Sequence, residues 1–251
     1  MTVNVDSPPG GRVVWSRIHL QETGSTNDLC KTLQPWSAVT ADSQTRGRGR
    51  FGRPFVSGRG GLWLSASLPA PPPADIWAGF SLRVGASLLA HLRSLGLESA
   101  RLRWPNDILC GNLKLAGLLI EQSADGPMIV GIGMNVFNEP WIDFPELRKT
   151  ATRLVDWIAP PELHTLASGV LDTLAEAHRL MILGGMRAAI EELNAQWTDP
   201  VPVEIDLAGG GTTHGAFLGL APNGHLRLLD SRGNTFLVEH PSVERLRELR
   251  A

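Results

Sequence analysis

The sequence predicts an α+β fold, in which a mixed or antiparallel sheet is covered by helices and followed by a small all-β domain. Three patterns support this prediction. Strand-like segments joined by tight turns fill the middle of the chain, from 101 to 136. Apolar residues recur at three- to four-residue spacing over 75–95, 161–183 and 186–197, which is typical of helices that cover a sheet. Beyond Pro202, short strand-like pieces alternate with Gly and Asn turns.

Length and composition narrow the class of protein. With 251 residues, 43% of them hydrophobic, the chain can bury a large core, and we expect one domain at 1–198 and a small β-domain at 199–251. The formal net charge of −2 gives no overall attraction to nucleic acid or to an anionic membrane. Cys30 and Cys110 lack metal-binding spacing, and we find no signal-peptide pattern and no apolar run of about 20 residues. A cytoplasmic protein without a membrane partner is expected.

Local patterns predict the elements of the N-terminal half. A polar tail over residues 1–11 leads into a strand near 13–20. Ser25-Thr26-Asn27 predicts a helix start, because these side chains cap free backbone amides. Alternating apolar residues over 62–68 predict a half-buried strand, and Asp75 is expected to cap the helix that follows it.

The segment 45–61 is unusual, because it carries five arginines and six glycines. Residues 47–52 satisfy G-x-G-x-x-G, but Arg53-Pro54-Phe55 and a strand follow where a dinucleotide-binding site needs a helix. Arg48 and Arg50 are two residues apart, so in an extended segment they would face one side and could meet one anion. We interpret the segment as an anion-binding loop over a small-molecule site. An Arg/Gly segment that binds RNA is the alternative.

Five motifs occur in order along the chain: Ser25-Thr26-Asn27, Gln44 with GRGRFGR (47–53), RWPND (103–107), KLAGLLIE (114–121) and GIGMNV (131–136). In this order they resemble the signature of the biotin protein ligases, in the group that lacks an N-terminal DNA-binding domain. The resemblance spans roughly residues 13–250. It implies a class II synthetase-like catalytic domain and an SH3-like C-terminal β-barrel. A helix-turn-helix module does not fit before Ser25, so we expect no DNA partner.

The resemblance also implies a reaction. Biotin and ATP would form biotinyl-5′-AMP and pyrophosphate, with Mg²⁺ bridging the phosphates. The mixed anhydride would then acylate a lysine of a biotin carboxyl carrier protein. A lipoate or octanoate ligase or transferase of the same architecture is the alternative among enzymes, although it is expected to lack this loop and the β-domain. The oligomeric state stays open, a homodimer included.

Site residues follow from the same resemblance. The catalytic residues would be Arg48, Arg50 and Lys114. The biotin site would comprise Ser25, Thr26, Asn27, Gln44, Gly47, Arg48, Gly49, Arg50, Lys114, Gly117 and Gly133. The ATP site would comprise Arg48, Arg50, Arg53, Phe55, Trp63, Asn106, Asp107, Lys114 and Asn135, with Asp107 as a Mg²⁺ ligand.

Several of these residues have a structural alternative. Ser25 and Thr26 can serve only as a helix cap, and Asn106-Asp107 only as a turn. Lys114 lies between two leucines of a predicted strand, so its ammonium would point away from their face, toward a substrate oxygen or as an edge charge. Phe51 and Phe55 depart from the family pattern, which has a basic residue and a tryptophan there.

The Arg/Gly loop is also expected to move. Ordering its glycines costs about 1–2 kcal/mol of backbone entropy per residue. We therefore expect the loop to be mobile in the empty protein and to close over the ligands, excluding water from the anhydride.

Overall fold

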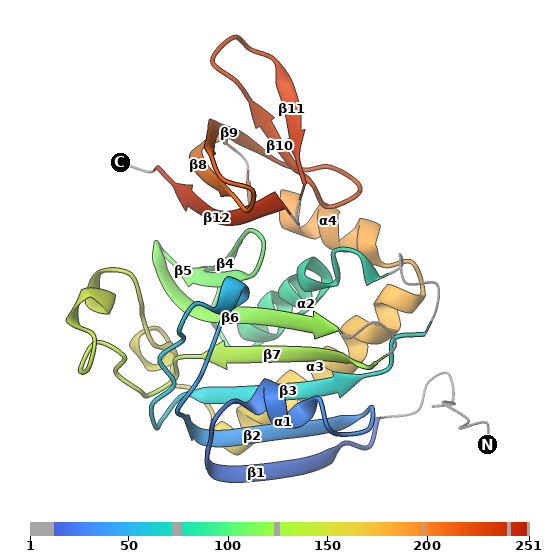
Figure 1. Ribbon diagram of the computed structural model, residues 1–251, viewed down its shortest axis with the longest axis vertical. Helices are drawn as coiled ribbons and strands as arrows, with labels where there is room; N and C mark the ends of the chain where they lie inside the picture. The colour runs from blue at the N-terminus through green and yellow to red at the C-terminus, as the bar shows by residue number, and fades with distance from the viewer. Residues whose placement is uncertain (1–12, 72–76, 123–125, 198, 240–241, 250–251) are drawn as a thin grey trace.

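The computed structural model describes residues 13–71, 77–122, 126–197, 199–239 and 242–249. Within these ranges the chain forms a seven-stranded sheet and a five-stranded sheet (Figure 1). The predicted N-terminal tail at 1–11 and the Asp75 cap lie outside the described residues. No helix within the described ranges is long and apolar enough to cross a membrane.

The larger sheet is mixed, as predicted, and its strand order is β1-β2-β3-β7-β6-β5-β4. Its strands are β1 (Ser16–Thr23), β2 (Ser37–Gln44), β3 (Leu62–Leu68), β4 (Ala100–Arg103), β5 (Asp107–Cys110), β6 (Leu113–Gln122) and β7 (Met128–Met134). β1 and β2 are parallel, whereas the other neighbours are antiparallel. β4 to β7 form the antiparallel meander that the turn spacing predicts.

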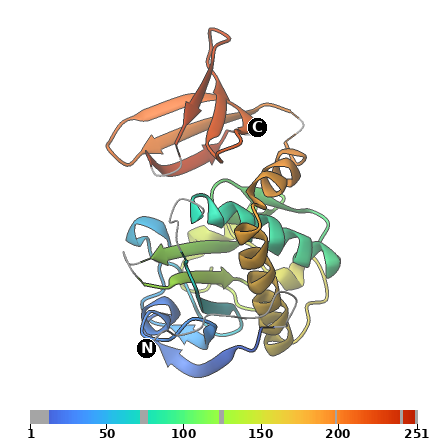
Figure 2. The same cartoon turned by 90° about the vertical axis from the view of Figure 1, so that its right-hand side faces the viewer.

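Helices cover both faces of this sheet, but unequally. α2 (Phe80–Ser94) and α3 (Leu163–Ile182) lie on one face, and the short α1 (Thr26–Cys30) lies on the opposite face (Figure 2). α2 begins at Phe80, later than its apolar spacing indicates, and the buried Trp77 precedes it. The part of this face that the short α1 does not cover is available for a functional site.

β3 corrects one prediction. The alternation over 62–68 predicts a half-buried strand, but every residue of β3 is buried. The apolar face packs into the main core with Leu64 and Leu68. Its other face lies beneath α1, where the hydroxyl of Ser65 donates to Oδ1 of Asn27 and its oxygen lies 2.7 Å from Oγ1 of Thr26. Ser65 can be fully buried in this strand, because its hydroxyl has hydrogen-bond partners.

The C-terminal part forms an antiparallel sheet with strand order β11-β10-β9-β8-β12, consistent with the predicted small β-domain. Its strands are β8 (Val201–Leu207), β9 (Thr212–Leu220), β10 (Leu226–Leu229), β11 (Thr235–Val238) and β12 (Val243–Glu248). α4 (Met186–Asn194) packs against β9 and joins the two parts. β12 was not predicted, because its sequence, VERLRE, is dominated by charges. This strand lies next to the Arg/Gly loop (Figure 1).

Candidate active site

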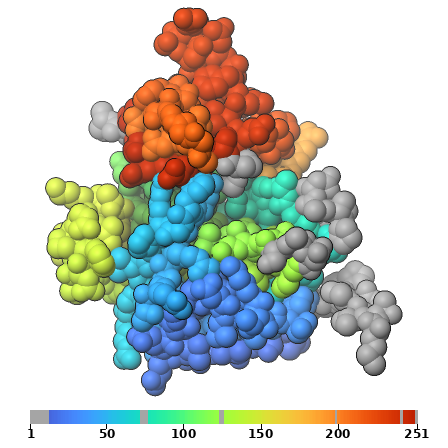
Figure 3. All heavy atoms as spheres, in the orientation of Figure 1, coloured from blue at the N-terminus to red at the C-terminus, as the bar shows by residue number. Residues whose placement is uncertain are grey.

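A cavity of about 590 Å³ lies between the α1 side of the larger sheet, the Arg/Gly loop and β12. In Figure 3 the light-blue loop rises from the blue N-terminal part to the red C-terminal strand. The predicted site residues that line this cavity are Ser25, Thr26, Asn27, Gln44, Arg48, Gly49, Arg50, Arg53, Phe55, Asn106, Asp107, Lys114, Gly117 and Gly133. Five separate motifs thus meet at one place.

Three predicted residues lie outside the cavity lining. Trp63 is 1% exposed, and its indole Nε1 donates to the carbonyl of Gly58, 2.9 Å away. The buried Asn135 donates through Nδ2 to the carbonyl of Thr152 at 3.2 Å. Gly47 accepts a backbone hydrogen bond from Phe55. All three hold neighbouring segments, and their contacts with ligands stay predictions.

The start of α1 is capped by a glutamine from β2. The backbone N–H of Thr26 donates to Oε1 of Gln44 at 2.8 Å, and its hydroxyl donates to the same oxygen at 3.0 Å. Ser25 occupies the N-cap position but makes no side-chain cap hydrogen bond. Its hydroxyl instead accepts from Nη1 of Arg48 at 3.4 Å. Gln44 therefore caps the helix, and the hydroxyl of Ser25 lies at the cavity. The contacts of Ser25 do not fit the alternative that this residue serves only as a helix cap.

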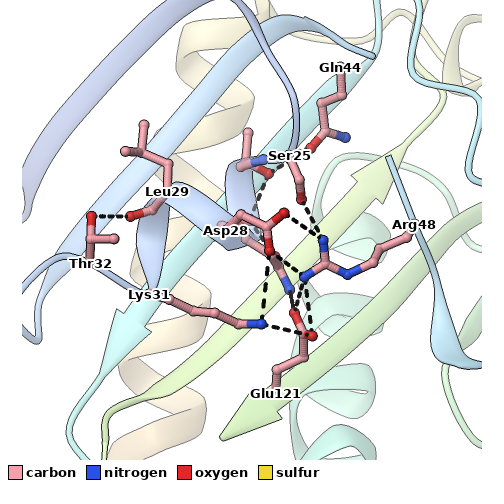
Figure 4. A network of polar contacts seen from close by, with 11 residues as sticks. Ser25, Asp28, Leu29, Lys31, Thr32, Gln44, Arg48 and Glu121 are labelled. Atoms are coloured by element: carbon pink, nitrogen blue, oxygen red, sulfur yellow. Dashed lines mark hydrogen bonds and ion pairs between the residues drawn. The ribbon is translucent and has the colours of Figure 1, made fainter. Parts of the chain in front are cut away.

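Arg48 is held by two carboxylates, as Figure 4 shows. Its guanidinium binds Asp28 in a bidentate pair, at 2.9 and 2.7 Å, and contacts Glu121 at 3.0 Å. The hydrogen bond from Arg48 lowers the pKa of Asp28, against an opposing effect of burial. Lys31 lies 3.0 Å from Oε1 of Glu121. We call Asp28, Lys31, Arg48 and Glu121 the Arg48 cluster.

Arg50 points elsewhere, which corrects the prediction that both arginines share one face. The chain leaves the extended conformation at the 3-10 turn Arg50–Gly52, where Phe51 has a φ of 56°. Nη2 of Arg50 donates to the carbonyl of Val243 in β12 at 2.9 Å. Burial lowers the pKa of Arg50, although the carboxylate of Asp107 acts in the opposite direction. Arg50 thus faces the β12 side of the cavity.

Lys114 and Arg103 flank a carboxylate in the WPND motif. Nζ of Lys114 lies 2.7 Å from Oδ1 of Asp107, and Nη2 of Arg103 lies 2.6 Å from Oδ2. Burial acts to raise the pKa of Asp107, but the charges of Lys114 and Arg103 outweigh it and lower the pKa. Asn106 donates to the carbonyl of Leu118 at 2.8 Å, which fixes the turn against β6.

The described residues offer no group of three or more His, Cys, Asp or Glu side chains that could hold a metal ion. Asp107 already has two cationic partners. A metal ion at this carboxylate would have to compete with both charges. Its role as a Mg²⁺ ligand stays a prediction.

The cavity floor is made of glycine backbone under an aromatic ring. A Cβ at Gly133 would lie 2.9 Å from Cε1 of Phe55, and a Cβ at Gly117 would lie 3.2 Å from Cε2 of the same ring. Nζ of Lys114 lies 5.3 Å from the ring centroid. Glycine at 133 therefore lets Phe55 reach the sheet, and a side chain at 117 would crowd the same ring.

Sequence reasoning missed part of the site. Asp28, Lys31 and Glu121 hold Arg48, and β12 adds the lining residues 244–248. One signal was available: Glu121 ends the KLAGLLIE motif as a lone carboxylate in an apolar strand. No local pattern indicates that β12 reaches the site.

The fold and the site together define an α+β protein with a cavity that is lined by the cations Arg50, Arg53 and Lys114. The chain belongs to the Biotin/lipoate A/B protein ligase family, whose model matches residues 5–135.

The chain is similar over most of its length to two named ligases. The biotin–[acetyl-CoA-carboxylase] ligase of Paracoccus denitrificans is 37% identical over 85% of this chain and 94% of that protein. The ligase of the same name from Mycobacterium tuberculosis is 32% identical over 90% of this chain and 87% of its own length.

The solved structure of the biotin protein ligase from Aquifex aeolicus in complex with biotin and ATP is also similar. It superposes with a TM-score of 0.81 and 27% identity, over 93% of this chain and 99% of that one. The chain spans less than half the length of the bifunctional ligase/repressors BirA that it matches, for example 46% of the protein from Bacillus spizizenii, at 36% identity.

Proposed function

We propose that the chain is an ATP-dependent biotin ligase. It forms biotinyl-5′-AMP and pyrophosphate from biotin and ATP, then transfers biotin to the amine of a lysine of a biotin carboxyl carrier protein, with release of AMP. One observation carries the proposal: a single cavity is lined both by uncharged hydrogen-bonding side chains, such as Thr26 and Gln44, and by the cations Lys114 and Arg50. The uncharged side chains suit the neutral ureido ring of biotin. The cations suit a carboxylate that reacts with a phosphate.

Positive charge is the main chemical contribution of the site. A carboxylate oxygen of biotin bonds to the α-phosphorus of ATP, and the bond from that phosphorus to the bridging oxygen breaks, so pyrophosphate leaves. Both reactants are anions, and fixed cations lower the barrier by stabilising the charge of the transition state. Lys114 and Arg50 line the cavity and are assigned this role. Mg²⁺ would add positive charge at the phosphates of ATP, and Asp107, which pairs with Lys114 and Arg103, is the residue assigned to hold it.

Biotin recognition is assigned to the α1 side of the cavity. Ser25, Thr26, Asn27 and Gln44 supply hydroxyl and amide groups that lie near one another. A site built to hydrogen-bond a substrate group strongly rejects analogues that lack it. Lipoate has no ureido group, so this polar lining favours biotin over the lipoate alternative.

ATP is assigned to the side that faces β12. Arg53 pairs there with Glu244 at 3.0 Å, and Asn106 and Asp107 line the same cavity. We assign Trp63 and Asn135 a supporting role for this side. The aromatic ring of Phe55 is available as a platform beside the reacting groups.

The wider setting of the enzyme is also proposed. A catalytic domain at 1–198 and a small β-domain at 199–251 fit the start of β8 at Val201. A cytoplasmic location and a carrier-protein partner follow from the proposed activity. β1 is an edge strand of the larger sheet, through which two copies could pair as a homodimer. Sedimentation of the purified protein measures that state.

Direct product detection tests the proposal. Purified protein is mixed with biotin and Mg-ATP labelled at the α-phosphate, and biotinyl-AMP is separated by chromatography. We expect product with biotin and none with lipoate in its place. Lys114→Ala and Arg48→Ala are expected to lose most of the activity. Product from lipoate alone would favour the lipoate ligase, whereas RNA binding that falls steeply with salt and no acyl adenylate would favour the RNA-binding alternative.

A further inference from the structure

Glu121, near the end of β6, accepts hydrogen bonds from two segments that are far from it in the sequence. Its carboxylate accepts from Nδ2 of Asn27 at 2.7 Å, from Nζ of Lys31 at 3.0 Å and from Nη2 of Arg48 at 3.0 Å. Asn27 and Lys31 belong to α1 or its end, and Arg48 belongs to the Arg/Gly loop. The side chains of Glu121 and Arg48 are only 25% and 24% exposed, so the pair is largely shielded from water. Glu121 therefore joins α1 to the loop.

Both terminal nitrogens of the Arg48 guanidinium donate to groups of the protein. Nη1 donates to Ser25 and Asp28, and Nη2 donates to Asp28 and Glu121. The Arg48 cluster contains two cations and two carboxylates, so its formal charges cancel. In this arrangement Arg48 adds little net positive charge to the cavity. Its contacts hold the loop in place.

The side-chain amide of Asn27 is fixed by the same network. Its Nδ2 donates to Glu121, and its Oδ1 accepts from the hydroxyl of Ser65. A Cβ at Gly131 would collide with that Oδ1, so glycine at this position leaves room for the amide. Because an acceptor and a donor contact opposite ends of the amide, Asn27 has a single favoured orientation. Glu121 thus sets a predicted biotin ligand as well as the loop arginine.

We propose that Glu121 is a positioning residue of the biotin site, which orients Asn27 and Arg48 together and so ties the Arg/Gly loop to α1. The proposal rests on the biotin-ligase function proposed above. Glu121 acts through its two neighbours. Asn27 belongs to the predicted biotin site alone, so Glu121 affects the binding of biotin more than that of ATP, whose assigned side is lined by Arg53, Asn106 and Asp107.

Glu121→Gln tests this role, because glutamine keeps the shape but brings two N–H donors to a place where Asn27, Lys31 and Arg48 all donate. Amide exchange over 46–56 in the ligand-free protein is expected to become about tenfold faster. KM for biotin is expected to rise about tenfold, whereas KM for ATP stays within about twofold of the parent. Glu176→Gln is the matched control, because it breaks an Arg–Glu pair on the exposed side of α3. It should change none of these values.

A second variant separates the two contacts of Glu121. Asp28→Asn removes the other carboxylate on Arg48 without touching Asn27. It should speed exchange in the loop and raise KM for biotin less than Glu121→Gln does. In Arg48→Gln, adding Glu121→Gln should change loop exchange by no more than about twofold, because the contact is already lost.

Two results would overturn the role of Glu121. One is loop exchange and KM for biotin in Glu121→Gln that match those of Glu176→Gln. The other is an additive effect on loop exchange of Arg48→Gln and Glu121→Gln. If the parent forms no biotinyl-AMP, the proposed function fails, and loop exchange in the ligand-free variants still decides whether Glu121 orders the loop. If Glu121→Gln does not fold, Glu121→Asp, which keeps the charge but withdraws it from Asn27 and Arg48, is measured in its place.

Discussion

The ammonium of Lys114 lies 2.7 Å from Oδ1 of Asp107, and the same carboxylate contacts Arg103 at 2.6 Å. The side chain of Lys114 is 31% exposed and that of Asp107 is 17% exposed. Asp107 thus holds a lysine at the wall of the cavity in a fixed position. An incoming carboxylate or phosphate oxygen meets this ammonium without the need to order a flexible side chain.

Lys114→Met removes the charge and keeps the aliphatic stem. We predict that kcat/KM for biotinyl-AMP formation falls about 100-fold or more, because a preorganised charge at the reacting oxygen is lost. The fold should persist, since Asp107 retains Arg103. Lys149→Met, at an exposed lysine outside the cavity, is the control and should leave the rate unchanged. A Lys114→Met enzyme as fast as this control would remove Lys114 from the mechanism.

Gly133→Ala should displace the ring of Phe55 from the cavity floor. The added Cβ would lie 2.9 Å from Cε1 of Phe55, closer than packed carbon atoms allow. We predict weaker biotin binding, by about tenfold in Kd, measured by calorimetry. Gly58→Ala is the matched control in the loop, since a Cβ there would meet nothing within 4 Å. Equal Kd values for the two variants would show that the floor does not shape the biotin site.

His178 predicts a pH dependence of stability. Burial lowers the pKa of His178 from its ordinary value of 6.5, although its hydrogen bond to the carbonyl of Pro69 acts in the opposite direction. A histidine whose pKa is lower in the folded state takes up a proton more readily when unfolded. Its contribution to the free energy of unfolding therefore falls as pH drops below about 6.5. Burial lowers the pKa of His91 as well, so both histidines act in the same direction.

Denaturant unfolding at pH 7.5 and 5.5 measures this dependence. We predict that the parent loses free energy of unfolding between these values, and that His178→Gln, which keeps an N–H donor without a titrating ring, loses less. The same loss in both proteins would contradict the assignment to His178.

Ligands are predicted to order the Arg/Gly loop. Arg48 ties the loop to α1 and Arg50 ties it to β12, so the loop has two fixed points beside the cavity. Closure over bound substrates would exclude water from a hydrolysable anhydride. Amide exchange over 46–58 should slow when biotin and Mg-ATP are both present. Unchanged exchange would mean that the loop is already ordered without ligand, contrary to the expectation from its glycine content.

Local patterns were sufficient for much of the fold. The strand-like segments and tight turns between 101 and 136 predicted the meander of β4 to β7, since strand pairing between sequence neighbours is specified locally. β12 was missed because four of its six residues are Arg or Glu and its two apolar residues lack the alternation of a strand, although Val243 is fully buried. Its place is set by pairing with β8 and by ion pairs such as Arg101 with Glu248. Such tertiary partners leave no local signal.

Site residues were predicted where a motif marks them, and they were missed where contacts between distant segments give a residue its role. Gln44 and Lys114 were found from their motifs, and both line the cavity. The prediction that Arg48 and Arg50 face one side was wrong, because the chain turns at Phe51. Glu121 was part of a quoted motif, yet its partners come from α1 and the loop, so its role became visible only once the three segments were assembled.

Formation of biotinyl-AMP in a single turnover is the most direct measure of the central claim, that cations in this cavity join biotin to the α-phosphate of ATP. Enzyme in excess over labelled ATP, with biotin and Mg²⁺, should convert the label to biotinyl-AMP with equal release of pyrophosphate, and Lys114→Met should not. Absence of the acyl adenylate with the folded parent, or equal yield from Lys114→Met, would contradict it.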